Sequence, residues 1–136
     1  MAEKPTTHEF TVDTPLATLL SSLARIPLFM IHMVPTAQFA ATPGAERQEI
    51  LRQHLRFLAE LDRRGILFAS GPLDRDTSGD VIEGMSIIAA PSRDAAAQIM
   101  AEEPFARAGM RTNTVRSWSL NEGASVPTAR DLVEAG

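Results

Sequence analysis

The sequence predicts an α+β fold in which two helices cover one face of a four-stranded antiparallel sheet. Apolar runs typical of strands occupy residues 28–34, 66–70, 81–90 and 112–120. Apolar side chains at helical spacing lie between the first and second runs, and a second helical segment lies between the third and fourth. The order strand, helix, strand, strand, helix, strand is that of the split βαβ, or ferredoxin-like, arrangement.

The chain begins with a segment, residues 1–27, that is predicted to be an extension outside the core. Its polar start precedes a short helix expected from Thr14 to Ala24, with Thr14 as N-cap and Pro15 in the first turn. Pro27 is expected to separate this helix from the core.

A change in periodicity marks the first strand and the first core helix. The run "LFMIHMV", residues 28–34, is apolar apart from His32 and predicts a buried central strand, with His32 in the core. Residues 35–45 are rich in helix breakers and predict a loop. Over residues 45–64 apolar side chains recur on one helix face, and Gly65 is expected to end this helix.

The second pair of strands is predicted to form a hairpin. The strand "ILFAS", residues 66–70, is joined to the strand at 81–90 by a segment dense in turn formers, residues 74–80. Ser92 is then expected to cap the second helix, with Asp94 in the first turn, where the helix dipole favours an acid.

The chain closes with a turn, a strand and a tail. The second helix should end before Pro104, and "PFARA", closed by Gly109, forms one further short turn. The last strand follows at 112–120. Residues 121–136 predict at most one short helix from Thr128, in a tail expected to be mobile or to wrap a neighbour.

Length and composition are those of one globular domain, and its predicted core elements run over residues 28–120. The 136 residues are 44% hydrophobic and 22% charged, and the net charge of −4 gives no electrostatic footprint for nucleic acid. The chain has no cysteine, which fits a reducing compartment, so a cytoplasmic location is expected. We read no export signal and no run of membrane-spanning length, and we expect no membrane partner.

The predicted fold leaves one face of the sheet without helices. An apolar sheet face has to be buried, and pairing with a second copy of the chain is the simplest way to bury it. A two-fold homodimer is therefore expected.

Three segments resemble the YCII-related family, namely "RQHLRFLAELDRRGILFASGPL", "DAAAQIMAEEPFARAGM" and "VRSWSL". They supply a helix histidine, a Gly-Pro after the second strand, and an acidic-Pro-aromatic turn ending in Ala-Gly. The resemblance covers about residues 28–120 and implies a small dimeric α+β barrel-like protein. It also implies a cleft where the helix histidine meets the carboxylate of the turn. Some relatives eliminate chloride from chlorinated hydroxyquinones, the fold also resembles muconolactone isomerase, and many other relatives have no assigned activity.

His54 is the helix histidine, and it lies near the centre of the apolar stripe of the first core helix. It must therefore be buried or line a cleft. One interpretation is a core histidine that hydrogen-bonds a backbone carbonyl. The other is a general acid/base, because histidine side chains change charge near neutral pH, and the resemblance favours this second interpretation.

Glu103 occupies the acidic position of the turn, where the family usually carries Asp. Asp can cap the short helix beginning at Pro104, whereas Glu is one methylene longer and is expected to cap poorly. Its carboxylate still lies by a helix N-terminus and should stay ionised, so that it could orient His54 and stabilise the imidazolium. Two alternatives stay open. Glu103 is an ordinary exposed glutamate without a role, or Glu102 takes the role instead.

Four further residues are candidates for substrate binding. Ser70, Gly71 and Pro72 are explained as a strand end and a turn, yet Gly71 would let a ligand approach the backbone and the Ser70 hydroxyl could bond it. Arg116 shares a strand face with Trp118. Its guanidinium either points to solvent or turns inward to hold a carboxylate or phenolate.

Two classes of function follow from these residues. One is a cofactor-independent lyase or isomerase that acts on a small anionic metabolite through His54 and Glu103. The other is a non-catalytic module that binds a small molecule or a protein. Finding both side chains together in a cleft would favour the enzyme, whereas Glu103 in solvent would favour the module. The chain's three histidines, His8, His32 and His54, lack the spacing of a metal motif, so neither a metal nor a cofactor is expected.

Overall fold

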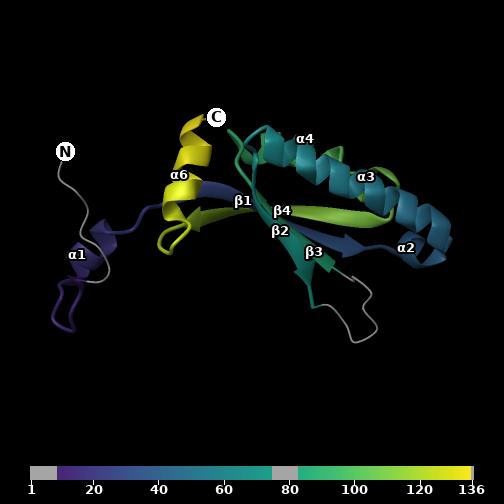
Figure 1. The fold of residues 1–136 in the computed structure, drawn as a ribbon. Coiled ribbons are helices and arrows are strands. Elements are labelled where there is room, and N and C mark those ends of the chain that lie inside the picture. The colour runs from purple at the N-terminus through teal and green to yellow at the C-terminus, as the bar shows by residue number, and fades with distance from the viewer. Residues whose placement is uncertain (1–8, 75–82, 136) are drawn as a thin grey trace.

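A four-stranded antiparallel sheet lies at the centre of the computed structural model, which describes residues 9–74 and 83–135 (Figure 1). Its strands are β1 (Ile26–Pro35), β2 (Leu67–Leu73), β3 (Glu83–Ile88) and β4 (Arg111–Leu120). They lie in the order β2-β3-β1-β4, and every neighbouring pair is antiparallel. The predicted ferredoxin-like order of elements is confirmed. Most of the expected hairpin turn, from residue 75 on, and His8 lie outside the described residues.

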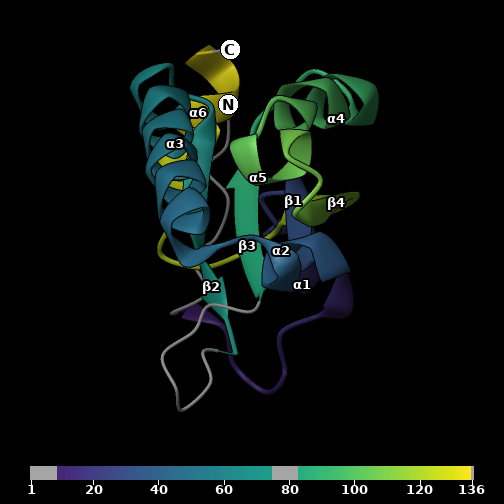
Figure 2. The same ribbon diagram turned by 90° about the vertical axis from the view of Figure 1, so that its right-hand side faces the viewer.

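The helices α3 (Gly44–Arg63) and α4 (Arg93–Ala101) cover one face of this sheet (Figure 2). Alternate residues of β1 point toward them, because side chains of a strand alternate between its faces. The short helix α5 (Pro104–Arg107) follows α4 and contacts α3. The buried cluster between sheet and helices consists of Phe29, Ile31, Met33, Leu61, Ile88, Ala96 and Met100.

The helix ends follow the signals in the sequence. The hydroxyl of Ser92 accepts a hydrogen bond from the backbone N–H of Ala95 at 3.0 Å, and Asp94 lies in the first turn of α4. Gly65, with a φ of 71°, follows the end of α3. A left-handed residue at this place is tolerated best when it is glycine.

The C-terminal helix α6 (Val126–Ala135) packs at one end of the sheet (Figure 1). Its buried contacts are with side chains of the face opposite to α3 and α4. Ala129 is fully buried there, in a cluster with Ile26, Leu28, Ile87 and Leu120. The expected short helix is present, although it begins at Val126 rather than Thr128, whereas the expectation of a mobile or neighbour-bound tail was wrong. An apolar stripe of Val126, Ala129 and Val133, one helical turn apart, gives this segment a place on its own sheet.

The rest of this second face carries no close-packed helix within the described residues, and we call it the open face. Leu28 packs under α6, but Met30, the next residue of β1 on the same face, is only partly buried. Trp118 is 38% exposed and Val34 is 36% exposed. The open face consists of Met30, His32, Val34, Glu83, Met85, Thr114, Arg116 and Trp118.

The start of the chain differs from the prediction in two places. The helix α1 (Leu16–Ser21) begins after Pro15 and has no side-chain cap, because the hydroxyl of Thr14 instead accepts the backbone N–H of Thr11 at 2.8 Å. Strand β1 begins at Ile26, so Pro27 lies inside it. Strand β3 pairs with β1 only from residue 29 onward, so at Pro27 the strand has a single neighbour and the missing N–H is tolerated.

The segment predicted as a loop at 35–45 contains a short helix, α2 (Ala37–Ala41). Its residues, AQFAA, include three alanines, and alanine has the strongest intrinsic helix preference. Pro43 marks the end of this helix and the start of α3. Within the described ranges, no helix combines the length and apolar character needed to cross a membrane.

Candidate active site

His54 lies in the middle of α3 and is buried, with 9% of its side chain exposed. It faces α5 rather than the solvent. Its Nδ1 atom lies 2.6 Å from Oε1 of Glu103, and its ring lies 5.4 Å from the ring of Phe105, measured between centroids. The two residues that the sequence singled out as a pair are therefore in direct contact.

Glu103 is the N-cap of α5 and is completely buried. Its Oε2 accepts the backbone N–H of Ala106 at 2.8 Å, and Oε1 accepts that of Phe105 at 3.1 Å. The expectation that Glu would cap poorly was wrong, because the extra methylene lets the carboxylate reach both N–H groups and His54 together. Glu102, the alternative, is exposed and forms an ion pair of 3.4 Å with Arg107.

The electrostatics of Glu103 favour its ionised form. Burial alone would raise the pKa of Glu103, but hydrogen bonds from His54 and from the backbone of Ala106 and Phe105 outweigh it. The net result is a pKa of Glu103 below the ordinary value. A carboxylate held ionised by three donors has no proton to give, so it acts only as an acceptor.

The ionised carboxylate determines the tautomer of His54. Because Glu103 can only accept, Nδ1 of His54 carries the proton and donates it. In the neutral ring the lone pair then lies on Nε2, which has no hydrogen-bond partner among residues 9–74 and 83–135. The geometry therefore leaves Nε2 available to take a proton from another molecule.

Arg111, the first residue of β4, is a further charged group near this pair, and the sequence analysis missed it. It is only 6% exposed, and its guanidinium carbon lies 4.2 Å from the centroid of the Phe105 ring. Burial lowers the pKa of Arg111, while the negative charge of Glu103 opposes that effect. His54 and Arg111 thus both contact the ring of Phe105.

The predicted binding residues Ser70, Gly71 and Pro72 were expected at a strand end and a turn, but they lie inside β2 and do not contact the pair. Ser70 is joined to the buried Ser86 of β3, with 3.0 Å between their hydroxyl oxygens. Gly71 and Pro72 are exposed, and they pair with residues 85 and 84 of β3. In the described contacts, none of these residues reaches His54 or Glu103.

Two residues lie on the other side of the sheet from His54. Arg116 is exposed and stands opposite Met30, on the open face. His32 was expected in the core, but its side chain is 37% exposed and hydrogen-bonds Glu83 through Nε2. In an entirely apolar run the alternation of strand faces is invisible, so the sequence did not show that His32 leaves the core.

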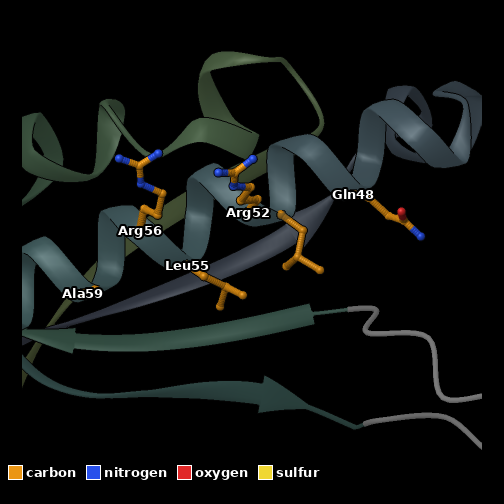
Figure 3. Close-up of a pocket in the computed structure, with 6 residues that line it drawn as sticks. Gln48, Arg52, Leu55, Arg56 and Ala59 are labelled. Carbon is orange, nitrogen blue, oxygen red and sulfur yellow. The ribbon is translucent and has the colours of Figure 1, made fainter.

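Two surface hollows lie among the described residues near α3, and neither of these two is lined by His54 or Glu103. The larger, of about 430 Å³, lies along the outer surface of α3, where Arg52 and Arg56 point to one side and Leu55 to the other (Figure 3). The smaller, of about 230 Å³, is lined by Thr42, Ile50 and Met110 among others. Of these, Ile50 lies on α3 one helical turn before His54. Among the described residues no group of three His, Cys, Asp or Glu side chains could hold a metal ion.

The fold and the buried pair define a small α+β protein with a histidine–carboxylate site between a helix and a turn. The chain belongs to the YCII-related domain family, whose model matches residues 28–119.

A solved structure with a similar fold is the 5-chloro-2-hydroxyhydroquinone dehydrochlorinase TftG from Burkholderia phenoliruptrix AC1100, in complex with 2,5-dihydroxybenzoquinone. The two chains share 23% identity, and the match covers 67% of this chain and 92% of that one, with a TM-score of 0.51. No curated protein sequence matches the chain. This likeness supports the fold.

Proposed function

We propose that this protein is an acid/base enzyme, a lyase or isomerase, that acts on a small anionic molecule with a cyclic or aromatic skeleton. The observation that carries the proposal is the contact of 2.6 Å between Nδ1 of His54 and the ionised carboxylate of Glu103. This contact orients the ring and directs the lone pair of Nε2 away from Glu103. No cofactor is required for such chemistry.

In the proposed reaction His54 moves one proton. Nε2 removes a proton from the substrate, and the electron pair of the broken bond stays on the substrate. In an elimination this pair forms a double bond while the leaving group departs with its own pair. In an isomerisation the imidazolium returns the proton to a different atom. Glu103 stabilises the positive ring in both cases without becoming protonated.

The relative of known structure supports the choice of reaction class. Dehydrochlorination is an elimination, and the ligand in that structure, 2,5-dihydroxybenzoquinone, is a small oxygenated ring. At 23% identity the comparison guides the choice of test compounds and does not identify the substrate of this chain.

The alternative is a module that binds a small molecule or a protein without converting it. One observation favours it: neither of the two hollows beside α3 is lined by His54 or Glu103. A buried His–Glu pair can also serve only to hold α3 against α5.

Two measurements separate these functions. The first is binding of 2,5-dihydroxybenzoquinone, followed through the NMR signals of the His54 ring. The second is chloride release from 5-chloro-2-hydroxyhydroquinone by the wild type, by His54→Gln and by His32→Gln. An amide at position 54 can still donate to Glu103 but cannot exchange a proton at neutral pH, so turnover should fall by about 10²-fold or more. His32→Gln is the matched control and should keep wild-type turnover.

Equal turnover by His54→Gln and the wild type would refute the role of His54. No turnover together with undisturbed His54 signals would contradict the aromatic substrate class and favour the binding module.

We further propose that the protein is a homodimer formed through the open face. Trp118 and Val34 are more than one-third exposed there, next to the partly buried Met30 and Met85. Burying about 800 Å² on each partner is usual for a stable interface. A second copy would cover these side chains and complete a barrel.

A further inference from the structure

A buried arginine without a hydrogen-bond partner lies next to the His54–Glu103 pair. Arg111 is 6% exposed, and its Nε is buried with no acceptor. Within residues 9–74 and 83–135 its terminal nitrogens also form neither a hydrogen bond nor an ion pair. A guanidinium has five N–H donors, and burying even one of them without an acceptor is unfavourable, so the group is suited to bind an anion.

The carboxylate nearest to Arg111 in the buried site is already engaged. Both oxygens of Glu103 accept backbone N–H groups, and Oε1 also accepts from His54. Glu103 therefore acts on Arg111 through its field and forms no ion pair with it. Phe105 covers one face of the guanidinium, which leaves the edge that carries the donors for another partner.

Gly84 of β3 lies beside the tip of this guanidinium. A Cβ atom at position 84 would lie 3.0 Å from Cε of Met33 and 3.8 Å from Nη1 of Arg111. The tip of Arg111 thus lies over a strand position without a side chain, on the helix-covered side of the sheet. This is the same side as His54, and Phe105 contacts both residues.

We propose that Arg111 binds the anionic oxygen of the ligand, a carboxylate, phenolate or enolate, while His54 exchanges the ligand's proton. The inference rests on the proposed function and specifies the ligand class for the same site. When Nε2 of His54 removes a proton, the electron pair left behind is delocalised onto the oxygen that Arg111 contacts. A fixed guanidinium at that oxygen stabilises the charge as it develops.

This assignment replaces Arg116 as the anion-binding residue. The two arginines are five residues apart on one strand, so they lie on opposite faces of the sheet. Arg116 is exposed on the open face, while Arg111 is buried beside Phe105.

The test uses benzoate, a planar carboxylate, and benzamide, its neutral analogue of the same shape. Calorimetry should show benzoate binding to the wild type at least tenfold more tightly than benzamide, because charge-assisted bonds to a guanidinium are strong. Arg111→Met should lose at least tenfold in benzoate affinity and should bind both probes alike. Arg116→Met, on the same strand, is the matched control and should bind benzoate as the wild type does.

A melting curve separates ligand binding from packing. Removing an unpaired buried charge should leave the melting temperature of Arg111→Met unchanged or raise it. If Arg111 served only to pack on Phe105, this variant would melt lower and would bind benzoate normally. Should Arg111→Met fail to fold, Arg111→Lys, which keeps the charge and loses the fork, should bind benzoate several-fold more weakly than the wild type.

Benzoate binding that is absent in the wild type, or equal in the wild type and the folded Arg111 variant, would overturn this inference. The role of His54 would then still stand or fall by the turnover of His54→Gln. Conversely, full turnover by His54→Gln with benzoate binding lost in Arg111→Met would refute the proton transfer and leave the anion site intact.

Discussion

Among the described residues, each side of the sheet has a histidine–glutamate pair. The two pairs consist of the same residue types but differ in burial and in the hydrogen bonds that support the carboxylate. His54 and Glu103 lie under the helices, with 9% and 0% of their side chains exposed. His32 and Glu83 lie on the open face, with 37% and 33% exposed. One pair is sealed from bulk water, and the other shares its charges with the solvent.

The support around each carboxylate explains why only one pair is a candidate site. Glu103 accepts two backbone N–H groups at the start of α5 in addition to His54, which lowers its pKa. Glu83 lies in a strand and has His32 as its side-chain partner. A His–Glu contact therefore becomes a defined acid/base pair when backbone N–H groups fix the acid.

The largest expected difference between the pairs is in stability. Glu103→Ala removes a cap and leaves His54 without its acceptor, so it should lower the free energy of unfolding by about 2–4 kcal/mol. Glu83→Ala removes a solvent-exposed partner and should cost less than about 1 kcal/mol. Urea denaturation at neutral pH measures both, and equal losses would remove the distinction between the two faces.

The open face itself is tested by the oligomeric state. Trp118→Glu places a charge in the proposed interface and should weaken dimerisation by about 2 kcal/mol or more, seen by light scattering as a shift toward the mass of one chain. Leu55→Glu is the matched control, because Leu55 is also exposed but lies on the outer surface of α3. A wild type that is monomeric at micromolar concentration would contradict the dimer outright.

A smaller effect is expected from pH. Because the pKa of Glu103 in the folded protein lies below its ordinary value of 4.5, its ionised form contributes stability above that value. This contribution is lost as the pH falls through the folded pKa. The stability advantage of the wild type over Glu103→Gln should therefore shrink on acidification below about pH 4.5. Denaturation curves at several pH values measure it, and an advantage that grows toward low pH would contradict the ionised carboxylate.

The smallest effect is expected for the histidine of the open face. At a protein concentration low enough to keep the chain monomeric, His32→Gln should change the free energy of unfolding by less than about 0.5 kcal/mol, because exposed pairs contribute little. A thermal melt of the variant beside the wild type is sufficient. A loss as large as that of Glu103→Ala would show that the His32–Glu83 pair is as important to the fold as the buried one.

Much of the fold could be predicted because its signals are local. The spacing of apolar residues, the cap Ser92 and the terminating Gly65 each depend on only one or two turns of helix. Together they predict the ends of α3 and α4 to within a residue or two. The errors fall where distant contacts decide, as for α6, whose apolar stripe has meaning only beside the sheet.

The sequence predicted the His54–Glu103 pair of the site but not Arg111. His54 stood out as a polar residue in an apolar stripe, and the turn motif pointed to Glu103. Arg111 gave no such signal, because β4 carries polar residues on both faces and no sequence pattern tells which face meets the helices. The presence of Trp118 favoured the face of Arg116, yet that face is the open one.

Glu103 performs two tasks with a single carboxylate, since it begins α5 and holds His54. Selection for a stable turn alone is therefore enough to preserve the acid, even in a descendant that has lost its reaction. The presence of an acid at this position is then no measure of activity. The residue at position 54 is the more informative one, because it caps no helix, and under the proposed function a histidine is retained there for its proton transfer.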